Sequence, residues 1–153
     1  MSTQPKFDWL FEYEETLDNG QTVHVDYDRE GDVLEVVFVK GSGQGIELSE
    51  EIVLRYDDSS NQPLSLILLG FSHFIQPTEY GPEIYLTGLE HLPAADRTKI
   101  LQMLTSAPVD RYLRVSALVL STKTPNGSPI AYARPQLAVV SKHVFTSQYY
   151  PRV

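Results

Sequence analysis

Residues 33–39 read Val33-Leu-Glu-Val-Val-Phe-Val39, and residues 64–71 read Leu64-Ser-Leu-Ile-Leu-Leu-Gly-Phe71. Both runs are rich in the β-branched and large apolar residues that strands favour. In each run the two alternating sets of side chains are largely apolar, so we expect both faces of these strands to be buried. The two runs therefore predict the centre of a β-sheet.

Turn-forming residues separate these runs from further strand-like segments. Asn19-Gly20 predicts a two-residue hairpin turn, because both residues accept positive φ. In a second turn, at residues 28–32, Gly31 is expected to supply the conformational freedom. Strands are expected at residues 7–16, 22–27, 33–39, 51–56 and 64–71, with a flexible loop at 41–45 and a turn at 57–63. This spacing predicts an antiparallel meander of about five strands.

The character of the chain changes at residues 75–83, where two prolines and a glycine interrupt any sheet pairing. Residues 92–106 predict one amphipathic helix, because Ile100, Leu101 and Leu104 fall on one side of it. Tyr112–Ser121 and Ile130–Ser141 flank Asn126-Gly127 and predict a C-terminal β-hairpin.

These elements predict a single α+β, mainly β domain over residues 1–153. Within it we distinguish an N-terminal β-meander subregion, 7–74, and a helix-plus-hairpin subregion, 84–153. One helix covers too little of a sheet whose central strands are apolar on both faces. We therefore expect the sheet either to close in a barrel-like way or to pair with a second copy of the chain.

Composition restricts the classes of function. The 153 residues include no cysteine, which excludes disulfides, thiolate metal ligands and cysteine nucleophiles. No apolar run approaches the roughly 18–20 residues that a membrane-spanning helix needs. The first residues show no basic region followed by an apolar core, so we expect a cytoplasmic protein without a membrane partner.

Charge is divided unevenly along the chain, whose net charge is −8. Residues 1–75 carry 15 acidic and 4 basic side chains, whereas residues 76–153 carry 5 acidic and 8 basic ones. The acidic half repels phosphate backbones, which makes nucleic acid an unlikely partner. The two halves are also suited to attract each other, within one chain or between chains.

Residues 25–71 resemble a small prokaryotic family known as domain of unknown function 2283. The likeness rests on Tyr27-Asp28 followed by Asp32-Val33-Leu34, on Ile52-Val-Leu-Arg-Tyr56-Asp57, and on the apolar strand 64–71. The chain departs from the family where Asp57-Asp-Ser-Ser60 replaces an Asp-x-x-Gly turn and where Ser65-Leu-Ile67 replaces Gly-Ile-Glu. The resemblance implies a compact β-meander without an established activity. Because some members are encoded beside toxin-like genes, it also motivates an antitoxin-like hypothesis.

No motif indicates catalysis or a cofactor. The four histidines are His24, His73, His91 and His143, and no two of them have metal-ligand spacing on one predicted element. His24 and Asp26 lie two residues apart on a strand, share a face, and are suited to form a local charge pair. We therefore predict neither a catalytic residue nor a metal or cofactor site.

Two sets of residues are candidate binding sites. The turn residues Asp28, Asp32, Asp57 and Asp58 are candidates for an acidic cluster if both turns lie at one end of the sheet, although separate capping of each turn is the simpler explanation. Aromatic residues at the two ends of the chain are expected to contribute to an interface: Phe7, Trp9, Phe11, Tyr149 and Tyr150.

Three functional hypotheses follow. The leading one is a non-enzymatic interaction module that self-associates as a homodimer. The alternative is an antitoxin-like or regulatory partner of a basic protein, bound through the acidic half. The third is a small-molecule binder or enzyme in which Asp32, Tyr56, His73 and Arg114 converge on a pocket.

Overall fold

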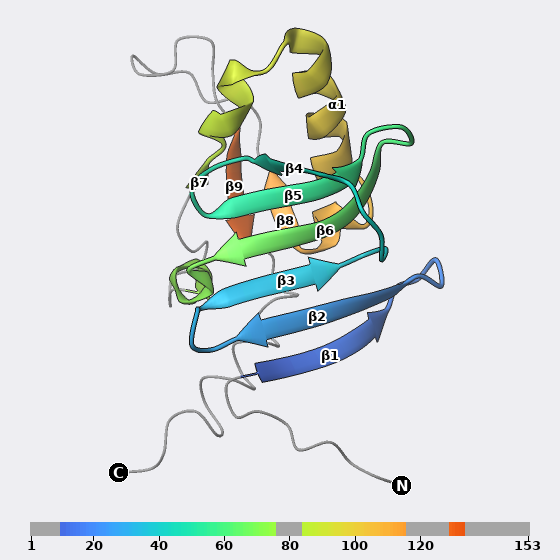
Figure 1. The fold of residues 1–153 in the computed structure, drawn as a ribbon, viewed down its shortest axis with the longest axis vertical. Helices are drawn as coiled ribbons and strands as arrows, with labels where there is room; N and C mark the ends of the chain where they lie inside the picture. The colour runs from blue at the N-terminus through green and yellow to red at the C-terminus, as the bar shows by residue number, and fades with distance from the viewer. Residues whose placement is uncertain (1–9, 76–83, 116–128, 134–153) are drawn as a thin grey trace, which may run out of the picture.

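A computed structural model describes residues 10–75, 84–115 and 129–133 of the chain. Six antiparallel strands form one sheet in the order β1-β2-β3-β6-β5-β4 (Figure 1). The strands are β1 (Leu10–Thr16), β2 (Thr22–Asp28), β3 (Val33–Val37), β4 (Gln44–Glu47), β5 (Ile52–Asp57) and β6 (Gln62–Leu69). The sheet thus consists of two three-stranded meanders that join where β3 pairs with β6. The predicted runs 33–39 and 64–71 are its two central strands.

Two turns differ from the sequence prediction. In the β1–β2 turn Gly20 has positive φ but Asn19 does not, and the Leu17 N–H donates to the Gln21 carbonyl oxygen at 2.8 Å, so the loop has three residues, 18–20, and not two. Gly20 has φ +89°, and its N–H donates to the Leu17 carbonyl oxygen at 2.9 Å, which closes the β1–β2 turn. In the β2–β3 turn the residue with positive φ is Asp32, at 57°, and not Gly31. Aspartate tolerates this region because its short polar side chain forms local hydrogen bonds.

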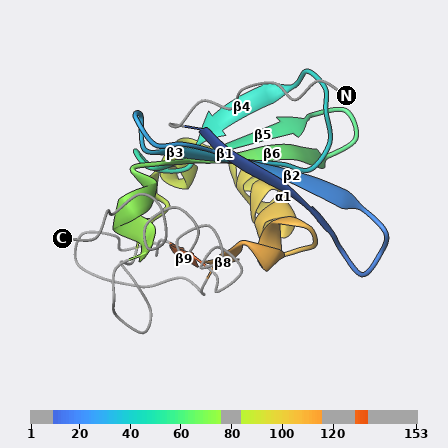
Figure 2. The ribbon, with the colours of Figure 1, turned by 90° about the horizontal axis from the view of Figure 1, so that it is seen from below.

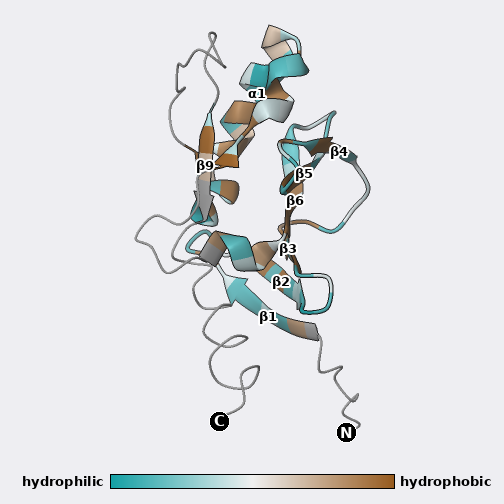
Figure 3. Cartoon of the chain, turned by 90° about the vertical axis from the view of Figure 1, so that its left-hand side faces the viewer, coloured by the Kyte–Doolittle hydropathy of each residue, from teal (hydrophilic) through white to brown (hydrophobic). Residues whose placement is uncertain are grey.

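The remaining elements form a second layer. In chain order they are η1 (Phe71–Ile75), β7 (Ile84–Tyr85), η2 (Thr87–His91), α1 (Ala94–Leu104), η3 (Val109–Arg111), β8 (Leu113–Val115) and β9 (Ile130–Ala133). The last three strands pair antiparallel as β7-β9-β8. Figures 2 and 3 show α1 and this small sheet on the same side of the large sheet. No helix in the described ranges is long and apolar enough to span a membrane.

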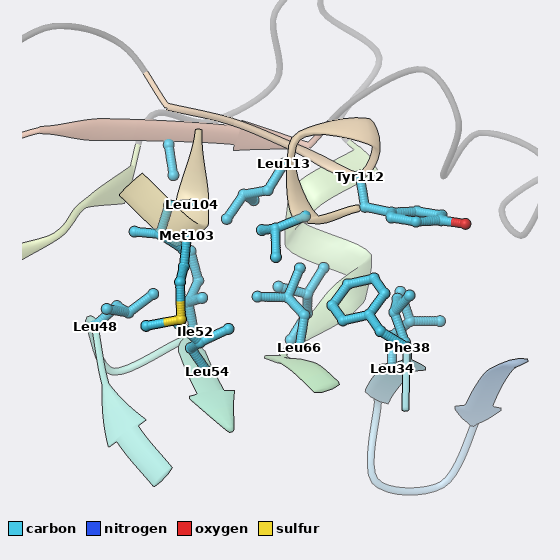
Figure 4. Close-up of a cluster of buried hydrophobic side chains, with 14 of the residues drawn as sticks. Leu34, Phe38, Leu48, Ile52, Leu54, Leu66, Met103, Leu104, Tyr112 and Leu113 are labelled. Atoms are coloured by element: carbon cyan, nitrogen blue, oxygen red, sulfur yellow. The ribbon is translucent and has the colours of Figure 1, made fainter. Parts of the chain in front are cut away.

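The core lies between the two layers. Every second side chain of the central strands points into it, including Leu34, Val36, Leu54, Leu66 and Leu68, all fully buried. From the other layer Met103, Leu104 and Leu113 pack towards these strands, and the Tyr112 and Phe38 rings lie 5.9 Å apart (Figure 4). Burial of this alternating set fixes the register of the sheet, since a one-residue slip would expose the whole set.

The predicted α+β, mainly β fold is confirmed, and the helix begins and ends within two residues of the prediction. Of the two expected ways to cover the sheet, barrel-like closure does not occur, and pairing with a second copy stays a prediction. The large sheet remains open, because β1 and β4 lie at opposite edges and do not pair. Cover of its inner face comes from α1 together with the small sheet and the 3-10 turns. Among the outward residues of the central strands Ser65 is fully buried, but the others are half-buried and Leu69 is 37% exposed, so a single chain does not bury both faces of these strands.

Close backbone approach at Gly88 ties the second layer to the large sheet. The Gly88 N–H donates to the Leu48 carbonyl oxygen at 2.8 Å, and a Cβ at this position would collide with the Glu47 carbonyl oxygen.

We predict that Gly88→Ala lowers the free energy of unfolding by about 1–3 kcal/mol, the usual cost of overpacking. Gly45→Ala is the matched control, because its nearest neighbour, Val53 Cγ1, would lie at 3.8 Å. Urea unfolding monitored by circular dichroism measures both, and equal midpoints would contradict the tight contact.

Burial raises the pKa values of two tyrosine side chains. The hydroxyls of Tyr13 and Tyr112 are buried and have no hydrogen-bond partner within the described residues. Burial, and secondly the charge of Glu15, raise the pKa of Tyr13 to about 12, and burial also raises the pKa of Tyr112. Below pH 10 both tyrosines are neutral in either state. Between pH 10 and 12 the unfolded chain ionises first, so stability falls as pH rises.

We predict that the double variant Tyr13→Phe, Tyr112→Phe is less sensitive to alkaline pH than the unmodified chain. At pH 12 it should retain about 2–3 kcal/mol more of its neutral-pH stability, which corresponds to the shift at Tyr13 alone. Tyr85→Phe, at a 46% exposed residue, is the control. Urea unfolding at pH 8, 10 and 12 measures the difference, and parallel pH profiles for all three chains would refute it.

Candidate functional site

The outer face of the large sheet, which we define as the residues of β1–β6 that point away from the second layer, is strongly acidic. Strand register places Glu12 beside Asp26, Asp26 beside Glu35, and Glu14 beside His24. Asp28 and Glu47 lie on the same face. Among the outward residues of the six strands, Arg55 is the one lysine or arginine side chain. Its Nη1 donates to Ser65 Oγ at 3.3 Å and its Nη2 to the Gly41 carbonyl oxygen at 2.9 Å.

An apolar strip crosses the middle of this outer face. It consists of outward residues of the three strands β3, β6 and β5, namely Val33, Val37, Val53, Ile67 and Leu69. The first four are half-buried, and Leu69 is exposed. The β3–β4 connection reaches Arg55 at one end of the face, but no described helix or strand covers the strip (Figures 2 and 3). Apolar surface rimmed by polar residues is typical of interaction sites.

At the β1–β2 edge of the outer face a histidine lies among carboxylates. His24 Nε2 is 2.8 Å from Asp26 Oδ1 and 3.7 Å from Glu12 Oε2, and His24 Nδ1 is 3.7 Å from Glu14 Oε2. The predicted proximity of His24 and Asp26 is confirmed. Burial, the largest cause, raises the pKa of Asp26, while His24 opposes the rise and Glu12 adds to it. The donor atoms of Glu12, His24 and Asp26 lie within 4.8 Å of one another.

The predicted acidic cluster of turn residues does not form. Asp28 and Asp32 lie in the β2–β3 turn, beside the last residue of β6, because Val33 pairs with Leu69. Asp57 pairs with Gln62 at the first residue of β6. The two turns therefore lie at opposite ends of the sheet (Figure 1). The assumption that they share an end was wrong because β4, which was not predicted, adds one reversal of chain direction between the two turns.

Each of these aspartates has a local structural partner. Asp28 Oδ1 accepts from the N–H groups of Glu30 and Gly31 at 2.9 and 3.2 Å. Asp57 Oδ1 accepts from the N–H and hydroxyl of Ser59, which lowers the pKa of Asp57. Asp58 pairs with Lys99 of α1 at 2.7 Å. These contacts agree with separate turn capping.

Asp32 connects two segments that are 40 residues apart. Its Oδ1 accepts from the Tyr27 hydroxyl at 2.7 Å and from the Ser72 N–H at 3.0 Å, and its Oδ2 accepts from the Ser72 hydroxyl at 2.7 Å. Its carbonyl oxygen accepts from the Phe71 N–H at 3.0 Å. With these bonds Asp32 holds η1 against the β2–β3 turn, so its role in the structure is to anchor the chain.

The expected aromatic interface is only partly within the described residues. Phe11 is half-buried on the inner side of β1, and its ring lies 5.8 Å from that of Tyr13. Its position favours packing over an exposed anchor. Phe7, Trp9, Tyr149 and Tyr150 lie outside the described residues.

The residues suggested to converge on a pocket are spread over the molecule. Asp32 and His73 lie near η1, which follows the end of β6. The Tyr56 hydroxyl donates to Gln44 Oε1 at 3.3 Å, near the opposite end of the sheet, where β6 begins. Arg114 is exposed on β8 of the small sheet. The structure therefore gives no support to a site built from these four side chains.

Sequence reasoning missed the residues that the outer face gathers. Glu12, Glu14, Glu35 and Glu47 were not considered as site residues, and neither was the apolar strip. The length of the hairpin loop decides this: the observed loop centred at Asn19 places Glu12 opposite Asp26 and Glu14 opposite His24, whereas the predicted two-residue turn would place Glu12 opposite Tyr27.

Comparison with known proteins adds no relative: no family model, no curated protein and no solved structure matches this chain. The resemblance of residues 25–71 to domain of unknown function 2283 stays a prediction. The function of this chain is therefore inferred from its own surface residues.

The hydrogen bonds of Asp32 predict a large effect on stability. Asp32→Ala leaves the buried Tyr27 hydroxyl without this acceptor and places alanine at positive φ, so we expect it to cost about 2–4 kcal/mol of unfolding free energy. Asp32→Asn should cost less, because asparagine keeps one acceptor oxygen and tolerates the backbone. Asp58→Ala, which removes an exposed ion pair, should cost at most about 1 kcal/mol. Equal urea midpoints for Asp32→Ala and Asp58→Ala would show that Asp32 is no anchor.

Proposed function

We propose that this chain is a non-catalytic interaction module whose outer face binds an apolar polypeptide segment flanked by lysine or arginine. The observation that carries the proposal is the combination of the apolar strip with an acidic surround. Carboxylates lie on both sides of the strip, with Glu12 and Asp26 towards β1 and Glu47 on β4, and Glu35 lies within β3 opposite Ile67.

Charge decides between classes of partner. Nucleic acids and anionic lipid surfaces would be repelled by this face. A basic segment gains long-range attraction to the carboxylates, and its apolar residues can cover the half-exposed valines and leucines of the strip. Arg55 offsets only one of these negative charges, because its guanidinium keeps its charge while it donates to the neutral oxygens of Ser65 and Gly41. The proposal thus corresponds to the hypothesis of a basic partner.

A second copy of the chain is the alternative partner for the outer face. Face-to-face pairing of two outer faces would bring one acidic surround against another, and like charges oppose such a contact. Residues 134–153 of a second copy fit the face better by charge, because this segment contains three basic and no acidic side chains. Self-association is therefore a separate outcome of the experiment.

The experiment measures binding of a defined probe to the full chain. We use a soluble peptide that alternates lysine with valine, and as its control the same peptide with glutamate in place of lysine. We expect the lysine peptide to bind and the glutamate peptide not to bind, with affinity falling as salt rises. Glu35→Lys with Glu47→Lys should weaken binding about tenfold, since each pair contributes up to about 1 kcal/mol.

Further variants separate the face from the rest of the surface. Ile67→Ser should weaken binding by removing apolar contact at the centre of the strip, whereas Glu90→Lys, on exposed η2, should leave binding unchanged. Equal affinity for both peptides, or insensitivity to Ile67→Ser, would rule the proposal out. Light scattering on the same samples identifies the alternative partner: a dimer that persists in 1 M salt and is lost in Ile67→Ser would assign the face to a second copy.

A further inference from the structure

The Glu12, His24 and Asp26 side chains bring together the donor types that a borderline divalent metal ion prefers. They comprise one imidazole nitrogen and two carboxylate oxygens, all within 4.8 Å of one another. Imidazole nitrogen with carboxylate oxygen suits Zn²⁺ and its neighbours among the transition metals, whereas Ca²⁺ and Mg²⁺ prefer oxygen alone. We propose that these three residues bind one divalent transition-metal ion of the Zn²⁺ class.

The backbone presents the three donors without rearrangement. His24 and Asp26 are alternate residues of β2 and share the outer face, and Glu12 is the direct cross-strand neighbour of Asp26 on β1. Paired strands hold these Cα positions, so only side-chain torsions need to change. Metal bonds of about 2.0–2.2 Å put neighbouring donor atoms roughly 3.0–3.5 Å apart. The observed separations from His24 Nε2, 2.8 Å to Asp26 and 3.7 Å to Glu12, bracket that range.

The second nitrogen of His24 also has a suitable neighbour. Nδ1 lies 3.7 Å from Glu14 Oε2, on the side of the ring away from Asp26 and Glu12. A histidine that binds metal through one nitrogen commonly donates the other N–H to a carboxylate, which fixes the ring and its tautomer. A small side-chain movement would bring Glu14 into this role.

Charge at the site favours a cation. The carboxylates of Glu12, Glu14 and Asp26 face His24, and Glu35 on β3 lies beside Asp26 in the sheet. No lysine or arginine of the described residues forms an ion pair with any of these carboxylates. A dication relieves the repulsion that a single histidine only partly offsets.

Calorimetric titration of the full-length chain with Zn²⁺ tests the inference. We expect one saturable site per chain that persists in millimolar Mg²⁺. His24→Ala, Glu12→Gln and Asp26→Asn should each lower the affinity at least tenfold. His91→Ala is the matched control, because His91 is exposed on η2 and outside the site. Melting curves without metal establish that each variant is folded, and Zn²⁺ should raise the melting temperature of the parent and of His91→Ala only.

Three results of the titration would contradict the metal site. Absence of saturable binding at 100 µM Zn²⁺, or unchanged affinity in folded His24→Ala, would overturn the site. Equal binding of Mg²⁺ that is independent of His24 would show only a diffuse acidic surface, and would also overturn it. The result is separate from the proposed docking function, since the titration contains no peptide and Ile67→Ser should bind Zn²⁺ normally.

Discussion

The alternation of side chains across the central strands is the constraint on which the structure depends. One alternating set, which includes Val36, Leu54 and Leu66, is fully buried under the second layer, and its burial sets the register of every strand pair. The other set of the same strands is also apolar, with Val33, Val37 and Ile67, but no described helix or strand covers it. The register that builds the core therefore also places the apolar strip at the surface.

The same constraint distributes the charges. Because directly paired residues share a face, the acidic residues of β1, β2, β3 and β4 gather on the outer face, except Glu15, which pairs with Val23 on the inner face and forms an ion pair with Arg111. Adjacent carboxylates such as Glu12, Asp26 and Glu35 repel one another, and this repulsion costs stability in the isolated chain. A basic segment or a metal cation would offset that cost. The surface thus has an energetic reason to bind positive charge as well as apolar groups.

Local features of the fold were readable from the sequence. Asn19-Gly20, the apolar runs 33–39 and 64–71 and the helix near residues 94–104 all appear where their propensities place them. Strand order was not readable, because the pairing of β3 with β6 depends on segments about 30 residues apart and on the insertion of β4 and β5 at the edge. That single topological fact separates Asp32 from Asp57 and removes the predicted cluster. Propensity likewise pointed to Gly31 for positive φ, whereas the hydrogen bonds of Asp32 decide it.

The histidine site depends on the register of one hairpin, and its relation to the apolar strip follows from the topology. The predicted two-residue turn at Asn19-Gly20 would place Glu12 opposite Tyr27, whereas the observed loop centred at Asn19 pairs Glu12 with Asp26 and Glu14 with His24. These residues lie at the β1–β2 edge, while Ile67 and Val53 lie on the β6–β5 side of the sheet. A dication at His24 would neutralise carboxylates on one side of the strip and leave Glu47 on the other. Metal and a basic segment would therefore compete by charge at one edge only, and the apolar contact of that segment at the centre would be independent of the metal.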